Sequence, residues 1–340
     1  MKNIFNNNLS DLEEYFLGKN EKKFKALQVF EWLYQKRVFN ANEFSNLKKE
    51  IREMLEEDFS FDMPKIIKIE EDQDTKKYLF ELMDGEKIEA VLMIHNYGNS
   101  VCISTQVGCN MGCRFCESGR LKKVRNLETH EMVCQILLIE ELIKDRIASV
   151  VLMGIGEPLD NYDNVIKFIE IINHPKGIQI GARHITISTC GLIPKIKELM
   201  DFPLQVNLAL SLHAASDEKR NELMPVNKMY KLADVLQIIR AYIAHTNRRV
   251  TMEYVMLNMV NDTKEDALAL ALLLRGMNVY VNLIPYNETN HIEFTKSSKE
   301  RVLAFYDILK KEKINVTIRR EFGSKISAAC GQLRSKEVDK

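Results

Sequence analysis

The sequence predicts an α/β protein whose core is an open six-stranded (β/α)6 partial TIM barrel, preceded by a small N-terminal helical domain and short antiparallel strands. Three patterns predict this fold: helical periodicity near the start, two-residue alternation after it, and apolar strands alternating with amphipathic helices beyond residue 100. Six strand-helix repeats are too few to close an eight-stranded barrel, so the sheet is expected to stay open. In such folds the functional residues lie at the carboxyl ends of the strands.

The predicted domain boundaries follow these patterns. Residues 1–60 carry apolar side chains at helical spacing and form the helical domain. Residues 61–98 alternate apolar and polar side chains around a Met83-Asp84-Gly85 turn and form a short β extension that links to the core. Residues 99–340 form the predicted barrel and a C-terminal cysteine segment. The six strands of the barrel are expected at 101–105, 149–153, 184–188, 206–210, 250–256 and 279–284.

The composition is that of an ordinary globular protein: of 340 residues, 46% are hydrophobic and 28% charged. No stretch resembles a signal peptide or is apolar enough to span a bilayer, so we expect a cytoplasmic protein with no membrane segment. Lys plus Arg and Asp plus Glu both total 48, so only short basic clusters such as Lys122-Lys123-Val124-Arg125 are available to meet phosphates. In a reducing compartment, the seven cysteines indicate metal ligands or reactive thiols.

Cys109, Cys113 and Cys116 form a C-x3-C-x2-C motif. Three thiolates with this spacing can each bind one iron of a [4Fe-4S] cluster and leave the fourth iron open to a small molecule. A structural zinc site is the alternative, but it normally takes four ligands in two close pairs, which three cysteines without an adjacent His fit poorly. The motif resembles that of the radical S-adenosylmethionine (SAM) enzymes. In those enzymes the open iron binds SAM, and one electron from the cluster cleaves SAM to a 5′-deoxyadenosyl radical.

Polar or glycine residues end four of the predicted strands. These strand-end residues are Gly156, Glu157, Ser188, Ser211, Leu212, His213 and Asn287. Each group alone is more often turn chemistry or helix capping. Because the ends of parallel strands converge on one face, the groups together with the cysteine motif predict a SAM pocket.

Two cysteines outside the motif are candidate reactive thiols. Cys330 lies between small residues near the C-terminus, an environment that suits an accessible thiol. Cys102 lies on the strand that leads into the cysteine motif, which carries its side chain toward the active-site face. Cys134 is most simply a buried residue of a helix, and Cys190 most simply packs near the pocket.

Taken together, these residues closely resemble the RlmN/Cfr family of radical SAM RNA methyltransferases, over nearly the whole chain. The matching segments include Lys25–Leu33 in the helical domain, Gly156–Pro158, Ser211–His213 and Ala329–Leu333. The resemblance implies a [4Fe-4S] cluster on the three motif cysteines, SAM on the strand-end residues, and two SAM molecules per turnover. The helical domain and the nearby strands are then expected to grip the RNA.

The resemblance also implies a mechanism, because C2 or C8 of adenine is too electron-poor to accept the electrophilic methyl group of SAM directly. Cys330 takes a methyl group from one SAM, a second SAM supplies the radical that removes hydrogen from it, and the carbon radical adds to adenine. Glu89 is the base by the family pattern, although from the residues alone it is more simply a solvent-facing strand carboxylate. Cys102 then attacks the sulfur of Cys330, which forms a disulfide and releases the methylated base.

The segments Val206–Ala214 and Val316–Arg320 look more like the C2 enzymes of the family than like its C8 antibiotic-resistance branch. The resemblance therefore implies C2 methylation of adenosine in 23S rRNA and in tRNA beside the anticodon, by a monomer that receives electrons from a flavodoxin or ferredoxin. A C8 methyltransferase and a non-catalytic Fe-S RNA-binding paralogue stay open as alternatives. The chain departs from the family pattern at Glu117, Lys325 and Ser327.

Overall fold

A ten-stranded sheet forms the centre of the protein in the computed structural model, which describes residues 1–289, 293–320, 326, 328 and 331–333. The strand order is β14-β13-β12-β11-β10-β9-β6-β5-β4-β3. The strands from β6 to β14 run parallel to one another. Their bounds are β6 (Gly98–Cys102), β9 (Ile147–Leu152), β10 (Ile185–Thr189), β11 (Asn207–Ser211), β12 (Val250–Met256), β13 (Val279–Pro285) and β14 (Val316–Ile318).

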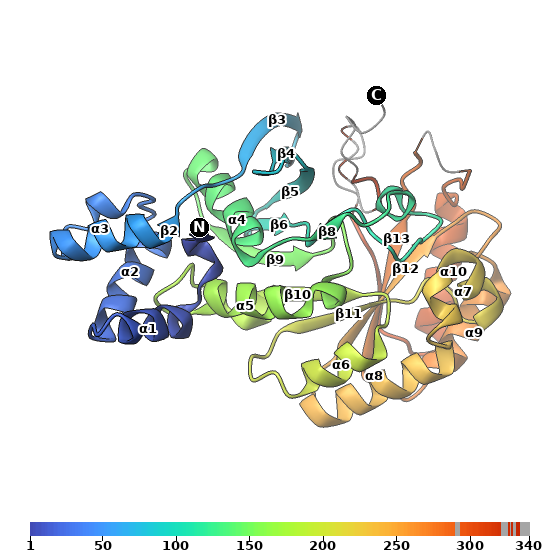
Figure 1. Ribbon diagram of the computed structural model, residues 1–340. Helices are drawn as coiled ribbons and strands as arrows, with labels where there is room; N and C mark the ends of the chain where they lie inside the picture. The colour runs from blue at the N-terminus through green and yellow to red at the C-terminus, as the bar shows by residue number, and fades with distance from the viewer. Residues whose placement is uncertain (290–292, 321–325, 327, 329–330, 334–340) are drawn as a thin grey trace.

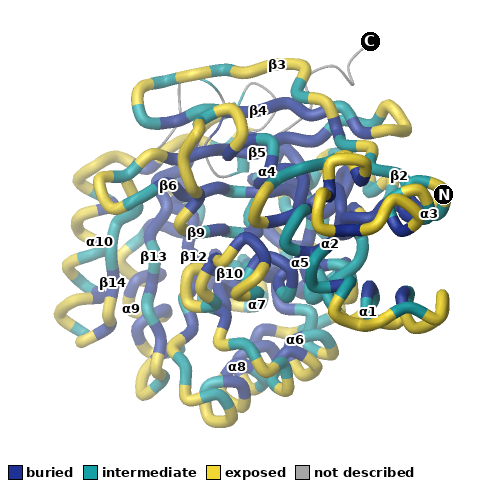
Figure 2. Tube along the Cα trace, turned by 90° about the vertical axis from the view of Figure 1, so that its left-hand side faces the viewer, coloured by how far each residue is buried: buried dark blue, intermediate teal, exposed yellow. Residues whose placement is uncertain are grey.

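The six predicted strands of the open barrel are confirmed as β6 and β9 to β13, and a seventh parallel strand, β14, was not predicted. Its three residues are too few to show a periodic pattern. Helices follow the strands along the chain (Figure 1). They are α4 (Thr129–Ile143), α5 (Tyr162–Asn173), α6 (Ile193–Met200), α7 (Asp217–Leu223), α8 (Leu232–Thr246), α9 (Lys264–Leu274) and α10 (Lys299–Lys311). Figure 2 shows buried strands inside and exposed outer faces on the helices, which explains the continuously apolar strand sequences.

The strands expected as a short extension are instead part of the main sheet. They are β3 (Lys65–Asp72), β4 (Thr75–Glu81) and β5 (Lys87–His95), each seven to nine residues long. These strands pair in antiparallel fashion, and β5 also pairs in antiparallel fashion with β6. The register sets Val91 of β5 opposite both Lys77 of β4 and Cys102 of β6, so these three side chains share one face of the sheet.

The first sixty residues form three helices and a small parallel pair of strands. Their bounds are β1 (Lys2–Asn3), α1 (Leu9–Gly18), α2 (Phe24–Tyr34), α3 (Lys49–Asp58) and β2 (Phe59–Ser60). Figure 1 shows α1, α2 and α3 grouped at one end of the molecule, beside α4 and α5. The buried side chains of these helices belong to the same hydrophobic core as those of the barrel.

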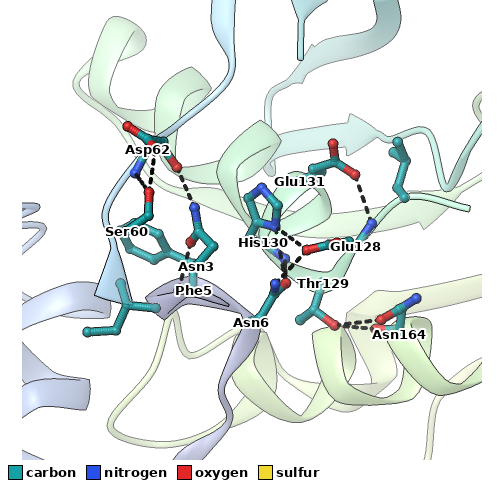
Figure 3. A network of polar contacts seen from close by, with 12 residues as sticks. Asn3, Phe5, Asn6, Ser60, Asp62, Glu128, Thr129, His130, Glu131 and Asn164 are labelled. Carbon is teal, nitrogen blue, oxygen red and sulfur yellow. Dashed lines mark hydrogen bonds and ion pairs between the residues drawn. The ribbon is translucent and has the colours of Figure 1, made fainter. Parts of the chain in front are cut away.

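Polar contacts join this helical segment to the start of α4 (Figure 3). The Asn6 amide nitrogen Nδ2 donates to Oε2 of Glu128 over 2.6 Å, and the backbone N–H of His130 donates to Oδ1 of Asn6 over 2.8 Å. Glu128 and Glu131 also close a capping box at the N-terminus of α4. The helical segment is therefore fixed to the barrel by specific hydrogen bonds as well as by packing. None of the described helices has the length and apolar character needed to cross a membrane.

Candidate active site

A cavity opens at the carboxyl ends of the parallel strands, where the predicted site residues meet. All three motif cysteines line it, together with Gly156, Glu157, Ser188, Ser211 and His213. Leu212 and Asn287 do not line the cavity. Leu212 points into the hydrophobic core, and Asn287 follows the lining residue Tyr286. Five of the seven strand-end residues and all three motif cysteines therefore surround one space.

The cysteine loop lies between β7 (Gln106–Val107) and a short 3-10 turn at Glu117–Arg120. Gly108, which precedes the first cysteine, has a φ of +72°, and a Cβ there would lie 2.2 Å from the carbonyl oxygen of Lys122. Only glycine allows this close approach, which sets the direction in which the loop leaves β7. The backbone N–H of Cys109 then donates to the carbonyl of Leu121 over 3.1 Å and closes the loop.

The chemistry of these thiols fits a metal cluster. Burial raises the pKa of Cys109 to about 12 and that of Cys113 well above its ordinary value, and a bound metal would hold these thiols as thiolates. In the described part of the chain, no three His, Cys, Asp or Glu side chains converge tightly enough to hold a single metal ion. Three thiols around one cavity instead suit a cubane, in which each cysteine binds a different iron.

Glu157 shapes the cavity through both of its carboxylate oxygens. Oε1 accepts from the backbone N–H of Leu159 over 3.1 Å, and Oε2 accepts from that of Cys190 over 2.8 Å. Gly156 has a φ of +107°, and a Cβ there would lie 2.6 Å from the Cβ of Gln106. The turn after β9 is thus hydrogen-bonded to the turn after β10 and packs closely against β7, the strand that precedes the cysteine loop.

His213 is a neutral, buried imidazole at the edge of the cavity. Its Nδ1 accepts from the backbone N–H of Val255 over 3.0 Å, which leaves the ring proton on Nε2. Burial and the charge of Arg220 lower its pKa to about 3. Its backbone φ of +57° is unusual for a residue other than glycine, and its ring meets that of Phe115 edge-on at 4.7 Å between centroids. The imidazole therefore offers one N–H donor of fixed orientation.

Arg220 is a site residue that the sequence did not indicate. Its side chain is fully buried, and all of its hydrogen bonds go to neutral acceptors. Nη2 donates to the carbonyl oxygens of Cys190 at 2.7 Å and Ser211 at 3.3 Å, Nε donates to Leu212 at 3.3 Å, and Nη1 donates to Asn227 at 2.6 Å. One guanidinium thus fixes the ends of β10 and β11, and no local sequence pattern predicts such a contact.

Glu253 is the second residue that sequence reasoning missed. It lines the cavity from the middle of β12, and it lies within the strand predicted from the sequence at 250–256, with no role assigned to it there. Its Oε2 accepts from the Asn282 amide over 2.8 Å. The available signal was a carboxylate inside a strand that is otherwise buried on both faces, since such groups are usually functional.

Glu89 and Cys102 lie on neighbouring strands and face the side of the sheet that also carries Ser188 and Ser211, although neither of them lines the cavity itself. Glu89 is 2% exposed, so its interpretation as a solvent-facing carboxylate is wrong. Its Oε1 lies 3.3 Å from Nζ of Lys77, which is also buried. The reason is that β3 and β4 extend the sheet beyond β5 and cover a strand that the sequence places near an edge.

Cys330 lies outside the described residues, as do Lys325 and Ser327. The described neighbours of Cys330 are held between the cysteine loop and β5. The carbonyl of Gly331 accepts from the N–H of Glu117 over 2.8 Å, and that of Leu333 accepts from Oγ of Ser118 over 2.8 Å. Ala328 and Leu333 pack with Val91, Met93 and Ile155, and Cys102 packs against this cluster.

Glu117, a departure from the family pattern, is 3% exposed and pairs with Arg120 at 3.2 Å. Its carboxylate is therefore held by a cation of its own 3-10 turn. Cys134 is fully buried in α4 and Cys190 is 5% exposed in the cavity wall, as their interpretation as packing residues requires. No disulfide joins any two of the six described cysteines.

Comparison with known proteins places these features in a family. Residues 103–271 match the Radical SAM superfamily, and residues 2–60 match the ribosomal RNA large subunit methyltransferase N-terminal domain. A probable dual-specificity RNA methyltransferase RlmN from Spiroplasma citri is 50% identical, over 99% of this chain and 98% of the relative. A protein of the same description from Enterococcus faecalis is 52% identical, over 100% of this chain and 98% of the relative. The crystal structure of a radical SAM methyltransferase from Sphaerobacter thermophilus superposes with a TM-score of 0.93 at 37% identity, covering 98% of this chain and 99% of that one.

Proposed function

Because the chain belongs to the RlmN family of radical SAM RNA methyltransferases, we propose that it methylates C2 of an adenosine in 23S rRNA and of the tRNA adenosine beside the anticodon. The observation that carries the proposal is the shared position of Glu89, Cys102 and the described neighbours of Cys330 on one face of the sheet. That face adjoins the cavity through Gly331, which lines it.

Cys109, Cys113 and Cys116 are the ligands that we assign to the [4Fe-4S] cluster. When bound, the cluster supplies the electron that cleaves SAM to a 5′-deoxyadenosyl radical. SAM then occupies the remaining cavity, against Gly156, Ser188 and Ser211, with Leu212 and Asn287 in supporting positions. Glu157 keeps the cavity in shape, and His213 offers its Nε2–H to an acceptor on the ligand.

Cys330 is the methyl carrier in this proposal. Its thiolate attacks the methyl carbon of one SAM and displaces S-adenosylhomocysteine, which leaves Cys330 as S-methylcysteine. The radical from a second SAM removes one hydrogen atom from the S-methyl group, and the carbon radical adds to C2 of adenine. The adduct then loses its ring proton to Glu89 and one electron, which the oxidised cluster would accept. Cys102 attacks the sulfur of Cys330 and forms a disulfide, and the released methylene carbon takes up a proton, such as that of the Cys102 thiol, to give the methylated base.

The basic cluster at residues 122–125 has fewer free cations to offer RNA than its sequence suggests. Lys123 pairs with Asp160 at 2.7 Å, and Arg125 pairs with Asp84 and Glu131, both at 2.7 Å. These side chains are held within the protein fold. We therefore assign the RNA grip to the helical segment 1–60 and to the exposed outer strand β3, in a cytoplasmic monomer that receives electrons from a flavodoxin or ferredoxin.

Two cysteine variants test the proposed division of labour. Cys330→Ala prevents methyl loading and gives no product, whereas Cys102→Ala loads, adds to the base and stalls as a covalent protein-RNA adduct. Cys134→Ala is the matched control, because Cys134 is buried in α4 and has no role in the reaction. Normal turnover of Cys102→Ala without an adduct would overturn the proposal.

Nucleoside mass spectrometry of ribosomal and transfer RNA, from cells with and without the gene, tests the substrate. We expect 2-methyladenosine in both RNAs to disappear with the gene. Loss of 8-methyladenosine instead would identify the C8 branch of the family. Unchanged methyladenosine, together with no 5′-deoxyadenosine from the reduced protein and SAM, would identify a non-catalytic RNA-binding protein.

A further inference from the structure

Glu253 presents a carboxylate to the cavity, and the described residues donate a hydrogen bond to only one of its two oxygens. The residue is 5% exposed and lies in the cavity wall. Its Oε2 accepts from Asn282, while its Oε1 makes no hydrogen bond in the described part of the chain. The strand register places Ser211 of β11, Glu253 of β12 and Asn282 of β13 side by side. Glu253 therefore stands in a polar row whose first member, Ser211, also lines the cavity.

Among the residues that the structure describes, none supplies a cation in contact with the carboxylate of Glu253. Within the described ranges, no Lys or Arg lies at ion-pair distance from its carboxylate, and Arg319 acts on it only from farther away. The guanidinium of Arg220, which is buried near this site, donates its hydrogen bonds to backbone carbonyls and to Asn227. A buried carboxylate in this state strongly favours a cationic ligand over a neutral one of the same shape.

We propose that Glu253 makes the cavity selective for the positively charged sulfonium of SAM over the neutral thioether of S-adenosylhomocysteine. The inference rests on the proposed function in one respect, namely that SAM occupies this cavity. Burial raises the pKa of the Glu253 carboxyl, and a cation that enters the cavity favours its charged form. Only SAM gains binding energy from this attraction, because S-adenosylhomocysteine carries no charge on sulfur.

Such selectivity serves a reaction that uses one cavity twice. Methyl transfer to Cys330 converts the bound sulfonium to a thioether, so the attraction to Glu253 is lost at the moment when the product must leave. Reductive cleavage of the second SAM likewise gives methionine and 5′-deoxyadenosine, which have no sulfonium. Each chemical step therefore weakens the binding of its own product and lets the next SAM compete for the site.

Equilibrium dialysis of the reconstituted holoenzyme, without reductant, tests the inference with SAM and S-adenosylhomocysteine as the two probes. We expect Glu253→Gln to lower the affinity for SAM about tenfold and that for S-adenosylhomocysteine less than threefold. Asn282→Lys, which places a cation beside the retained carboxylate, is expected to reduce the preference in the same way. Asn282→Leu keeps the charge and is expected to keep the preference.

An equal loss of both affinities in Glu253→Gln would show a contact with a part that the two ligands share, and would overturn the inference. An unchanged ratio in Glu253→Gln and Asn282→Lys would overturn it as well. If Glu253→Gln fails to fold, Asn282→Lys against Asn282→Leu decides. Failure of the proposed function is separate, because it would appear as wild-type protein that binds neither ligand or leaves RNA unmethylated.

Discussion

The buried cation beside Glu89 allows a sharp prediction of stability. Nζ of Lys77 lies 3.3 Å from Oε1 of Glu89 and 2.8 Å from Oε2 of Glu70. The side chains of Lys77, Glu89 and Glu70 are 4%, 3% and 22% exposed, respectively. Burial raises the pKa of Glu70, but the hydrogen bonds from Lys68 and Lys77 outweigh it and bring the pKa to about 2. Lys77 thus stabilises two carboxylates, one of them fully enclosed.

Lys77→Met removes the ammonium group and keeps most of the apolar stem. Removal of one partner of a buried ion pair costs about 3–5 kcal/mol, and we expect about 3 kcal/mol because Glu70 retains partial contact with water. Lys76→Met is the matched control. Lys76 pairs with Glu71 at 2.9 Å in the same strand, but the two side chains are 30% and 58% exposed, so less than about 1 kcal/mol is expected.

Urea unfolding of both variants, followed by circular dichroism at pH 7, measures the difference. The ion pair of Glu70 also predicts the direction in which stability changes with pH. Because its folded pKa lies below its ordinary value of 4.5, the stabilisation is present above that value and is lost as the pH falls toward about 2. Lys77→Met should weaken this acid dependence. Equal destabilisation by Lys77→Met and Lys76→Met would refute the reasoning.

Three further predictions concern the cavity. Gly156→Ala should abolish SAM binding in equilibrium dialysis, because the new Cβ would lie 2.6–2.9 Å from atoms of Gln106. Gly276→Ala is the control: Gly276 has a φ of +77° but nothing lies within 4 Å of its Cβ position, so this variant should lower the free energy of unfolding in urea by only about 1 kcal/mol. Arg220→Lys keeps the charge but loses the fork that holds three carbonyls, and should cost about 2–3 kcal/mol by the same assay. His213 has a pKa of about 3 when folded, so protons favour the unfolded state as the pH falls from about 6.5; His213→Gln should flatten that loss of stability by about 1 kcal/mol per pH unit in apoprotein melts.

The features that the sequence predicted are those that short stretches of chain determine. The parallel strands are recognisable because they are short, largely buried and rich in apolar and β-branched residues, as in β9 and β12. The three motif cysteines lie within eight consecutive residues, so their spacing alone indicates a cluster. Glycine and polar residues at strand ends are visible for the same reason. Each of these signals needs only the residues beside it.

The features that were missed depend on pairing between distant segments. Glu89 is buried because β3 and β4 continue the sheet beyond it, which the alternation within β5 does not reveal. Arg220 donates to the carbonyl oxygens of Cys190 and Ser211, and these hydrogen bonds form only because the fold brings the ends of β10 and β11 together. Glu253 reads as a strand residue until the register places it beside Ser211. The surroundings of these residues are set by tertiary structure, so no local sequence pattern predicts them.

The position of β6 explains how one sheet brings the two halves of the chemistry together. This strand pairs in antiparallel fashion with β5, which carries Glu89, and in parallel fashion with β9, whose carboxyl end leads to Gly156. Cys102 is the last residue of β6, and the chain continues from it through the short strand β7 into the cysteine loop. In the proposed reaction, only the one strand β6 therefore separates the proposed base Glu89 from the strand that leads to the SAM cavity. Gly331 and Leu333 accept hydrogen bonds from Glu117 and Ser118, which holds these two residues against the 3-10 turn that follows the cysteine loop.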